Sequence, residues 1–348
     1  MKVFITGGGG FIGSHAAEFY AQQGEEVVVF DNLSRMKFLG KSQDQNRYNW
    51  EYMGQYPNVK RVEGDIRNAE LLLEDLRGSD VVIHAAAQTA VTSSYEDPRA
   101  DFTVNALGTL NVLEASRSLP KPPTVIYCST NKVYGSNVNR IPVVSDQTRY
   151  RFQEERFQRG IDETLGLDHC ERSPYGCSKV SGDLYMQDYA RHYGLKVGVF
   201  RLSCVYGPRQ FGTADQGWLA WFAIATQIGK PIMIYGDGKQ VRDVLFVTDL
   251  ISAFHAFIQK ATAHAVFNLG GGADHTISLL ESLNLLQKRT GKRSPIQYGE
   301  WRPSDQKVYI SDIRKAKNLL GWVPRISVEE GVSRLVEWVK NNEGLFRI

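Results

Sequence analysis

The feature that most constrains the fold of this chain is a glycine-rich segment near its start. A strand-like apolar run at residues 2–5 leads into Thr6-Gly7-Gly8-Gly9-Gly10-Phe11-Ile12-Gly13, which places glycines at positions 7, 10 and 13. Glycine is needed where a backbone turns sharply, where it touches a pyrophosphate, and where a helix packs closely on a strand. A helix beginning near Phe11 would point its amide groups and its positive dipole end at that phosphate. The segment predicts a phosphate-binding turn, although any strand-to-helix turn can use a glycine cluster.

An aspartate follows the second apolar run, about 20 residues after the glycines, where dinucleotide sites place an acidic residue. The carboxylate of Asp31 could accept hydrogen bonds from both ribose hydroxyls of NAD and would repel the 2′-phosphate of NADP. Alternatively, Asp31 caps a turn, and the nearby Arg35 could weaken the preference for NAD. The role of Asp65 is also undecided by the sequence: its side chain could reach the adenine, or it could simply form a turn after a glycine.

Short β-branched or aromatic runs alternate with helix-like patterns at residues 3–6, 27–30, 81–84, 124–128 and 197–201. This alternation predicts an α/β fold with a doubly wound, parallel Rossmann sheet whose strands are buried on both faces. The 348 residues exceed one core of ordinary size, and the pattern loosens after about residue 205. We therefore predict an NAD-binding domain at 1–205 that carries the catalytic residues, and a smaller α/β substrate lobe at 206–348, with segments exchanged between the two.

Two long polar connections interrupt the pattern, at residues 34–58 and 136–172. Connections of this length are usually lids or binding loops, so substrate contacts are expected there. His169 and Arg172 are candidates for such contacts only because they fall shortly before Tyr175.

Composition limits the class of protein. A hydrophobic fraction of 42% and a formal net charge of +3 are ordinary for a globular protein and give no basic field that indicates nucleic-acid binding. No apolar run approaches the ~20 residues that span a bilayer, and no export signal is expected. The cysteines at 128, 170, 177 and 204 lack the CxxC spacing of a metal or redox site. We expect reduced thiols, no bound metal and a cytoplasmic protein.

A tyrosine and a lysine stand one helical turn apart in Tyr175-Gly176-Cys177-Ser178-Lys179. An ammonium beside a phenol lowers the pKa of the phenol by favouring the phenolate, so the tyrosine can act as a base. Thr130, just past a strand, would lie at the carboxyl edge of the sheet, where open α/β sheets bind ligands. Taken alone this spacing also fits a solvated helix face. After a dinucleotide fingerprint it predicts a catalytic group of Thr130, Tyr175 and Lys179.

The sequence resembles the extended short-chain dehydrogenases over nearly its whole length. Beyond the glycines, Asp31 and the tyrosine and lysine, the resemblance rests on Asn105-Ala106-Leu107-Gly108-Thr109, Val133-Tyr134-Gly135, Val205-Tyr206-Gly207-Pro208-Arg209 and Leu320-Gly321-Trp322. It implies an NAD cofactor, a nucleoside-diphosphate sugar as substrate, and a homodimer or homotetramer paired through two helices. The cofactor site that we assign comprises Gly7, Gly10, Phe11, Ile12, Gly13, Asp31, Asn32, Asp65, Ile66, Ala85, Ala86, Gln88, Asn105, Tyr175 and Lys179.

The two residues after Thr130 bear on the reaction. Dehydratases of this family follow the threonine with an aspartate and a glutamate, which act as acid and base in the loss of water, whereas this chain has Asn131 and Lys132. An amide cannot exchange a proton in that role and a lysine carries the opposite charge, so dehydration is disfavoured. Asn131 could instead satisfy a turn, and Lys132 could be an exposed charge at a strand end.

The choice among epimerases rests on resemblance. Residues 129–132, the 136–172 insertion, and the segments 209–211 and 215–218 resemble family members that invert C2 of a CDP-hexose more closely than those that invert C4 of UDP-galactose. The resemblance implies substrate contacts by Asn131, Lys132, Arg209 and Gln210, and a diphosphate gripped by the guanidinium forks of Arg242 and Arg302. Arg209 could instead form a surface ion pair, and Trp218, Trp221 and Phe222 could simply be core.

The implied mechanism begins when Tyr175 takes the proton of the 2-hydroxyl while hydride leaves C2 for NAD. The 2-keto sugar turns over, and hydride returns to its other face, so the cofactor ends unchanged. The alternatives are a UDP-sugar 4-epimerase, a net dehydrogenase or reductase that exchanges its cofactor at every turnover, and a non-enzymatic NAD-binding scaffold. The set of Thr130, Tyr175 and Lys179 argues against the scaffold.

Overall fold

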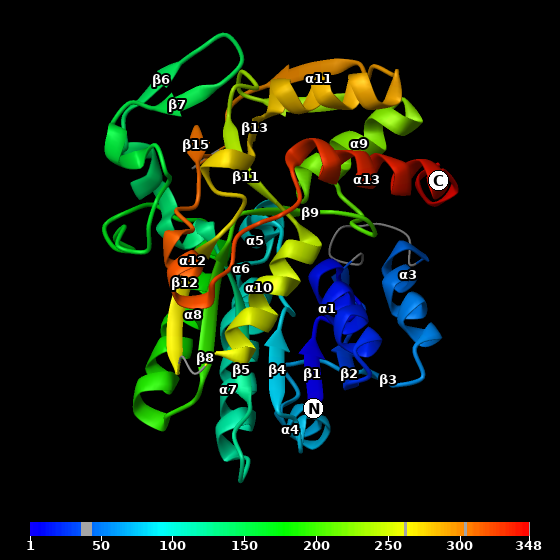
Figure 1. Cartoon of the computed structure of the whole chain (residues 1–348), viewed down its shortest axis with the longest axis vertical. Coiled ribbons are helices and arrows are strands. Elements are labelled where there is room, and N and C mark those ends of the chain that lie inside the picture. The colour runs from blue at the N-terminus through cyan, green and yellow to red at the C-terminus, as the bar shows by residue number, and fades with distance from the viewer. Residues whose placement is uncertain (36–43, 261–262, 303–304, 348) are drawn as a thin grey trace. The chain divides into compact units, whose positions relative to one another are not determined.

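The computed structural model describes residues 1–35, 44–260, 263–302 and 305–347, and it divides into two compact units (Figure 1). Unit 1 comprises Met1–Val133, Ser173–Arg201 and Ile251–Phe267, and unit 2 comprises Tyr134–Arg172, Leu202–Leu250 and Asn268–Ile348. The sequence prediction ran the first domain from 1 to 205. The prediction also expected segments to be exchanged between the two domains. In this division residues 134–172 and 202–205 belong to unit 2, and residues 251–267 belong to unit 1.

Unit 1 is built on a seven-stranded sheet with the strand order β12-β8-β5-β4-β1-β2-β3. The strands β1 to β5 pair in parallel, with Val3 opposite both Val27 and Val81. The prediction of a parallel, Rossmann-type sheet is confirmed. The strand bounds are β1 Lys2–Thr6, β2 Glu26–Asp31, β3 Val59–Glu63, β4 Val81–His84, β5 Thr124–Thr130, β8 Val197–Leu202 and β12 His264–Leu269.

Helices cover both faces of this sheet, since alternate residues of the strands point to opposite sides. On one face Phe4, Phe30 and Tyr127 pack in a single core with residues of α4, α7 and α8. On the other face Phe200 of β8 packs edge-on against Phe254 of α10, with ring centroids 5.0 Å apart. The helix bounds in and around unit 1 are α1 Phe11–Gln22, α3 Asp44–Tyr52, α4 Ala69–Leu76, α5 Val91–Glu96, α6 Pro98–Phe102, α7 Gly108–Ser118, α8 Pro174–Tyr193 and α10 Val247–Gln259, with short turns η1 Met53–Gln55 and η2 Thr103–Leu107.

Unit 2 has a mixed four-stranded sheet in which β11 pairs in parallel with β9 and β15 and antiparallel with β13. A parallel pair of β10 and β14 and the hairpin of β6 and β7 accompany it. The strand bounds are β6 Val143–Ser145, β7 Tyr150–Phe152, β9 Cys204–Tyr206, β10 Ile232–Tyr235, β11 Val241–Phe246, β13 Thr276–Ser278, β14 Ile296–Gly299 and β15 Val308–Tyr309. The sequence prediction of a smaller, less regular α/β lobe anticipated this kind of mixture.

Three helices of unit 2, α9, α11 and α13, pack against one another. Their ends follow from sequence: Ser278 and Glu281 form a reciprocal capping box at the start of α11, and Gly291 ends it in the left-handed conformation. The helix bounds are α9 Trp218–Ile228, α11 Leu279–Thr290, α12 Arg314–Leu320 and α13 Val328–Asn341, with short turns η3 Asn131–Arg140, η4 Glu155–Phe157, η5 Ala273–His275 and η6 Glu343–Phe346.

The two long connections acquire their own structure. In the first, α3 and η1 occupy 44–55, while residues 36–43 lie outside the described ranges. Tyr52 and Tyr56 fasten this segment to α1 by donating hydrogen bonds to Glu18, at 2.6 and 3.1 Å. The second connection forms the β6–β7 hairpin and belongs to unit 2. Substrate contacts by these segments stay a prediction.

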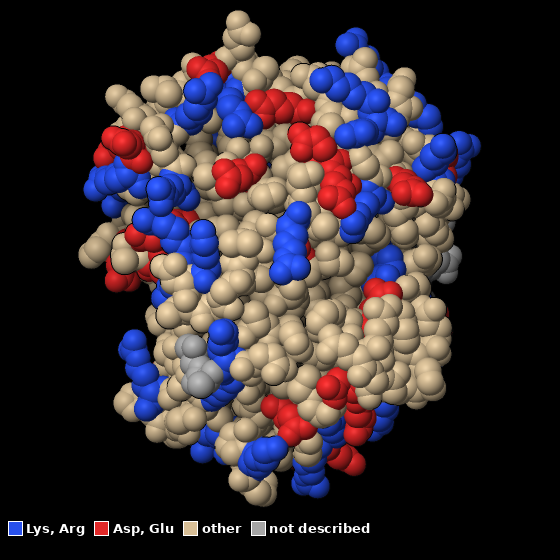
Figure 2. Space-filling model, viewed as in Figure 1, with Lys and Arg blue, Asp and Glu red and all other residues tan. Residues whose placement is uncertain are grey.

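Charged side chains of both signs are interspersed on the face drawn in Figure 2, with no extended area of a single sign. This mixture agrees with the small formal net charge. None of the helices within the described ranges has the length and apolar character needed to cross a membrane.

Candidate active site

The glycine turn joins β1 to α1 through contacts that no side chain could tolerate. Gly7 has a φ of +69°, and a Cβ there would lie 2.6 Å from the backbone nitrogen of Ala86. A Cβ on Gly13 would lie 2.1 Å from the carbonyl oxygen of Gly7. Gly10 caps α1 without any side-chain hydrogen bond, and no acidic residue occupies the first turn. The start of α1, at Phe11 and Ile12, is thus shaped for an anionic group, and it fits the pyrophosphate of a dinucleotide.

Asp31 ends β2 with its carboxylate next to this turn. Its two oxygens accept backbone hydrogen bonds from Gly9 (2.9 Å) and Leu33 (2.8 Å), which leaves further acceptor positions for a ribose. Burial raises the pKa of Asp31, and those hydrogen bonds together with the charge of Arg35 oppose this rise. The turn-capping and the ribose-binding interpretations are therefore compatible, because one carboxylate can serve both.

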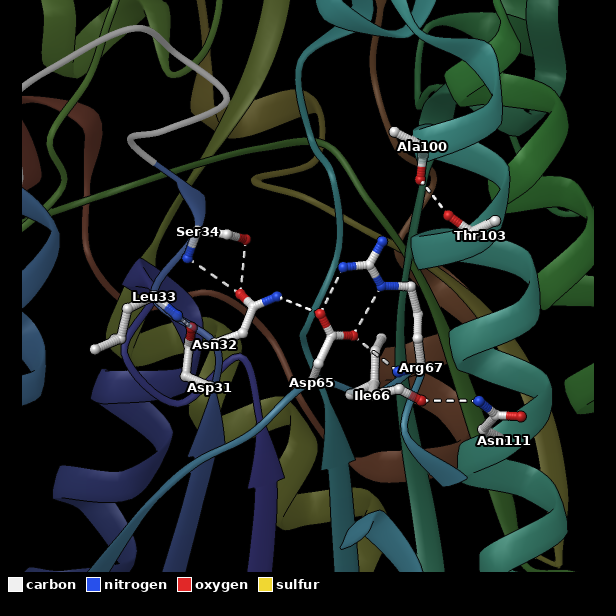
Figure 3. A network of polar contacts seen from close by, with 10 residues as sticks. All are labelled: Asp31, Asn32, Leu33, Ser34, Asp65, Ile66, Arg67, Ala100, Thr103 and Asn111. Atoms are coloured by element: carbon white, nitrogen blue, oxygen red, sulfur yellow. Dashed lines mark hydrogen bonds and ion pairs between the residues drawn. The ribbon is translucent and has the colours of Figure 1, made fainter. Parts of the chain in front are cut away.

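Asp65 is the centre of a polar network that links the ends of β2 and β3 (Figure 3). Its carboxylate accepts four hydrogen bonds: one from Asn32 Nδ2 at 2.8 Å, and three from the backbone and side chain of Arg67 at 2.6 to 2.9 Å. The Arg67 guanidinium lowers the pKa of Asp65 to about 2. Ser34 in turn donates to Asn32 Oδ1. Sequence reasoning missed Arg67, although it stands only two residues after Asp65. That Asp65 and Ile66 reach the adenine stays a prediction.

The loop after β4 is fixed by reciprocal hydrogen bonds with a π-helical turn. Gln88 donates its backbone N–H to Asn105 Oδ1 (2.9 Å), and Asn105 Nδ2 donates to the Gln88 carbonyl (3.0 Å). Asn105 lies in η2, a π turn, and such turns are frequent at functional sites. Its amide also contacts Asp101 and Ser178. Gln88 and Asn105, both predicted cofactor residues, thus lie together. Asp101 and Ser178, which the sequence analysis did not identify, help to hold Asn105 in place.

His84 is a further buried group that the sequence analysis missed. Its Nδ1 lies 2.7 Å from Thr6 Oγ1, and its Nε2 lies 2.9 Å from Thr109 Oγ1. Since Thr109 already donates to the carbonyl of Asn105, the Nε2 of His84 must carry the proton and Nδ1 must accept from Thr6. Burial lowers the pKa of His84 to about 3, so the ring is neutral. It connects the glycine turn with α7 through Thr6, whose hydroxyl also accepts from Ala86.

The three predicted catalytic residues come together in unit 1. Ser173 caps α8 by accepting from Gly176, and Pro174 starts the helix, so Tyr175 and Lys179 lie one turn apart near its N-terminus. Thr130, at the end of β5, lies close enough to Tyr175 to act on the pKa of its phenol. The three residues that the sequence analysis grouped thus lie near one another, and their catalytic role stays a prediction.

Protonation in this group differs from expectation. The sequence analysis expected the ammonium of Lys179 to lower the pKa of Tyr175, but burial dominates and raises this pKa to about 12, against the opposing effect of Thr130. Burial also lowers the pKa of Lys179 to about 8. The Lys179 ammonium donates to the Cys128 carbonyl at 2.6 Å and lies 4.3 Å from the centroid of the Tyr127 ring. Additional positive charge would be needed to favour the phenolate.

Asn131 and Lys132 directly follow Thr130 in unit 1. The Asn131 side chain is buried, with Oδ1 at 3.4 Å from Thr130 Oγ1, and the backbone N–H of Lys132 donates to the same hydroxyl at 3.3 Å. The Lys132 side chain is half-buried, so it is not the exposed strand-end charge of the alternative interpretation. No carboxylate stands at either position, and this leaves the threonine without the acid and base of a dehydratase.

The remaining predicted substrate residues belong to unit 2. Arg242 of β11 is buried and donates to Asp305 Oδ1 at 2.8 Å, and Asp305 donates its backbone N–H to the Arg302 carbonyl. The Arg302 guanidinium lies 4.0 Å from the centroid of the Tyr235 ring and contacts Asp215. The two predicted diphosphate residues are thus linked through Asp305.

Arg209 and Gln210 are buried in unit 2, so Arg209 is not part of a surface ion pair. Arg209 has a φ of +61°, a strained conformation of the kind that clusters at functional sites. His169 shares this feature, with a φ of +55° and a carbonyl that accepts from Arg140. Phe222 is core, as the alternative interpretation had it, whereas Trp218 is half-buried and donates to the Cys204 sulfur. Substrate contact by any of these residues stays a prediction.

All four cysteines are free thiols. Within the described ranges, no three His, Cys, Asp or Glu side chains are grouped so as to hold a metal ion.

Comparison with known proteins places these features in a family. The GDP-mannose 4,6-dehydratase family matches residues 4–335. A CDP-paratose 2-epimerase of Salmonella typhi is 41% identical over 353 residues, which cover 98% of this chain and 100% of the relative. The chain belongs to this family of extended short-chain dehydrogenases, as the sequence predicted.

Solved structures agree in fold. UDP-glucuronic acid 4-epimerase from Bacillus cereus, in complex with UDP-glucuronic acid and NAD, matches with a TM-score of 0.81 and 27% identity, covering 98% of this chain and 99% of that one. DesIV, a dTDP-glucose 4,6-dehydratase from Streptomyces venezuelae with NAD bound, matches with a TM-score of 0.82 and 28% identity, covering 100% of this chain and 99% of that one.

Proposed function

We propose that this protein is an NAD-dependent epimerase that inverts C2 of a CDP-hexose and converts CDP-paratose to CDP-tyvelose. The observation that carries the proposal is the composition of the site in unit 1, where Tyr175 lies beside Thr130 and the two residues after Thr130 carry an amide and an ammonium. This set can move a proton to and from a sugar hydroxyl, but it lacks the carboxylates that dehydration requires. The 41% identical CDP-paratose 2-epimerase supports the choice of substrate.

The cofactor is NAD, held by the glycine turn and by the Asp31 carboxylate. NAD, when bound, accepts hydride from the sugar carbon and returns it. Asp31 is suited to NAD because its carboxylate accepts hydrogen bonds from ribose hydroxyls and repels a 2′-phosphate. Thr130, Tyr175 and Lys179 of unit 1 then each have a defined task in the reaction, and none of these tasks consumes the cofactor.

Tyr175 takes the proton of the 2-hydroxyl as the C2 carbonyl forms, and gives it back when that carbonyl is reduced from its other face. Thr130 holds the same oxygen by a hydrogen bond. Lys179, fixed by the Cys128 carbonyl, contributes positive charge that stabilises the phenolate. Unit 2 contributes Arg242 and Arg302, whose guanidinium groups bind the diphosphate. A nucleotide fixed in this way leaves the sugar ring free to turn over.

A UDP-sugar 4-epimerase is the second candidate, because a solved relative of the same fold is a 4-epimerase. Both reactions begin with the same proton and hydride removal and differ only in the carbon presented to Tyr175. A net dehydrogenase would instead release reduced cofactor at every turnover.

The experiment that separates these candidates is proton NMR of the purified protein with CDP-paratose in deuterated water, without added NAD. Inversion at C2 without deuterium at that carbon is the expected result, since hydride returns from retained cofactor. Inversion only at C4 of a UDP-hexose would establish the second candidate, and accumulation of NADH when NAD is added would establish the dehydrogenase.

We further propose that the protein is a cytoplasmic homodimer. Exposed apolar side chains gather in unit 1 on helices that pack together, α5, α6 and α8 with the η2 turn. They are Tyr95, Phe102, Leu107, Leu184 and Tyr185. A second copy covering this face explains their exposure, because large apolar patches on soluble proteins mark contact surfaces. Light scattering of the wild type and of the Leu184→Asp/Tyr185→Asp variant checks this, with a dimer expected for the first and a monomer for the second.

A further inference from the structure

Between the two catalytic contacts of β5 with α8 lies a third contact, to which the mechanism assigns no role. The Cys128 carbonyl accepts a hydrogen bond from Lys179, and two residues later the catalytic threonine lies beside the catalytic tyrosine. The residue between them, Ser129, donates its hydroxyl to Asp183 Oδ2 at 2.7 Å. Asp183 follows Lys179 by one helical turn, as Lys179 follows the tyrosine, so three side chains in a row on α8 meet three consecutive residues of β5.

Asp183 is fully buried and its carboxylate is saturated with donors. Arg201, at the end of β8, donates from Nε to Oδ2 and from Nη2 to Oδ1, both at 3.0 Å, and Gln187 donates to Oδ1 at 2.8 Å. Arg201 is itself only 4% exposed. A buried ion pair is costly to desolvate and is weak evidence for stability, so its place beside the catalytic pair calls for another explanation.

A close backbone approach fixes the register of this contact. A Cβ on Gly182, next to Asp183, would lie 2.3 Å from the Tyr127 hydroxyl, so the absence of a side chain lets α8 lie directly on β5. The Tyr127 ring, in turn, supports the Lys179 ammonium. Displacement of Asp183 along or away from β5 would therefore also displace the lysine.

We propose that the Asp183–Arg201 ion pair positions the catalytic tyrosine and lysine against β5 and sets their proton equilibria through the balance of its own two charges. Asp183 is then a positioning residue. The inference rests on the catalytic roles of Tyr175 and Lys179 in the proposed function, and it extends them to groups that touch neither substrate nor cofactor.

The charges around Lys179 make such control possible. The ionisable groups that face it are Asp183 and Tyr175 on its own helix, Asp101 on α6, Cys128 and Tyr127 on β5, and His84 on β4, with Arg201 behind Asp183. His84 is neutral, and burial keeps Tyr127 protonated. Burial lowers the pKa of Lys179, and Cys128 and then the carboxylates of Asp183 and Asp101 raise it. Arg201 carries the opposite charge and is bonded to Asp183, so it offsets part of the Asp183 charge. Arg201 and Asp183 therefore act on the lysine in opposite directions.

The test compares the pH dependence of kcat in single and double variants. Asp183→Asn removes a negative charge and leaves Arg201 unopposed, so the profile should move to lower pH, by about one unit. Arg201→Met leaves Asp183 unopposed, so the profile should move to higher pH. The double variant removes both charges, and its profile should lie between those of the two single variants. A merely structural role predicts lower kcat without shifts of opposite sign.

A second readout needs neither substrate nor cofactor. The titration of Lys179 can be followed by NMR in protein carrying carbon-13 at the lysine ε position, with the signal assigned by its loss in Lys179→Met. The Lys179 pKa should fall in Asp183→Asn and rise in Arg201→Met. Glu114→Gln is the matched control, because Glu114 of α7 also receives a hydrogen bond from α8, through Tyr189, but lies outside the set of charges that face Lys179. It should leave both the titration and the profile unchanged.

Shifts of the same sign in both charge variants, or no shift in either, would overturn the proposal. If one single variant does not fold, the pH profile and the Lys179 pKa of the other single variant must still differ from those of the double variant in the stated direction. Ser129→Ala, which removes no charge, tests positioning: kcat should fall several-fold at unchanged KM, and wild-type kcat would contradict the positioning role. Full activity of Tyr175→Phe would instead refute the catalytic role of the tyrosine, an outcome that the substrate-free titration distinguishes from failure of the Asp183 inference.

Discussion

Lys179 donates its ammonium to the backbone carbonyl of Cys128 at 2.6 Å. This bond ties α8 to the strand that carries Thr130, and it fixes a positive charge in a buried place where desolvation lowers the pKa of Lys179 to about 8. The charge acts on the site from a fixed position rather than from a flexible side chain.

Tyr175→Phe should reduce kcat by about 10² to 10⁴-fold, because it removes the group that moves the proton of the sugar hydroxyl. Substrate binding should change little, since the ring is retained. Steady-state kinetics checks this. Tyr189→Phe, on the same helix but bonded to Glu114, is the control and should keep wild-type kcat. Equal loss in both variants would assign the effect to the helix rather than to the phenol.

Asp31→Asn should weaken NAD binding by about 10 to 100-fold, because a charged acceptor of ribose hydroxyls is lost. The discrimination against NADP should narrow, since the repulsion of a 2′-phosphate disappears and Arg35 remains nearby. Calorimetric titration of the apoprotein with both cofactors measures this. Asp80→Asn, a comparable change at the opposite end of the sheet beside Lys2, should leave both affinities unaltered. An unchanged ratio of the two affinities would show that Asp31 only caps its turn.

His84 should make the protein sensitive to acid. Its pKa is about 3 in the folded state, against an ordinary value of 6.5, so the unfolded chain binds the proton more readily. The stability contributed by neutral His84 is complete above about pH 6.5 and is lost as the pH falls towards 3, at up to about 1.4 kcal/mol per pH unit. Urea unfolding at several pH values should show a shallower dependence in His84→Gln than in the wild type. His192→Gln, at an exposed histidine, should follow the wild type.

Gly182→Ala should destabilise the fold by about 1 to 3 kcal/mol, because the added Cβ would lie 2.3 Å from the Tyr127 hydroxyl. The variant should also lose activity, since α8 must move away from β5. Combining Gly182→Ala with Tyr127→Phe, which removes the clashing oxygen, should restore part of the lost stability and part of the lost activity. Thermal unfolding and kcat measure the rescue. Gly166→Ala, at an open position, should be nearly neutral. Without rescue in the double variant, the clash would not be the cause.

Local patterns account for what the sequence could predict. The glycines at 7, 10 and 13, Asp31, and the spacing of Tyr175 and Lys179 each lie within one turn or helix, so their geometry follows from spacing. Thr130 could be placed beside them because it follows a strand whose end faces the carboxyl edge of the sheet.

What the sequence could not reveal depends on residues brought together from distant parts of the chain. Asp183, Ser129 and Arg201 come from a helix and two strands, and none has a neighbour in sequence that signals the contact. His84 looked like the end of a buried strand. The protonation of Tyr175 was also misjudged, because burial cannot be read from the spacing of a tyrosine and a lysine.

Completion of unit 1 requires residues 251–267, which provide most of α10 and of the edge strand β12 after a long stretch of unit 2. During synthesis, β8 and its neighbours therefore emerge from the ribosome well before their last partners exist. Until then Phe200 lacks the covering ring of Phe254, and the hydrogen-bonding edge of β8 is open. The nascent protein thus passes through a stage at which Thr130, Tyr175 and Lys179 have all been made while one edge of their sheet is still uncovered, and chaperones bind surfaces of that kind.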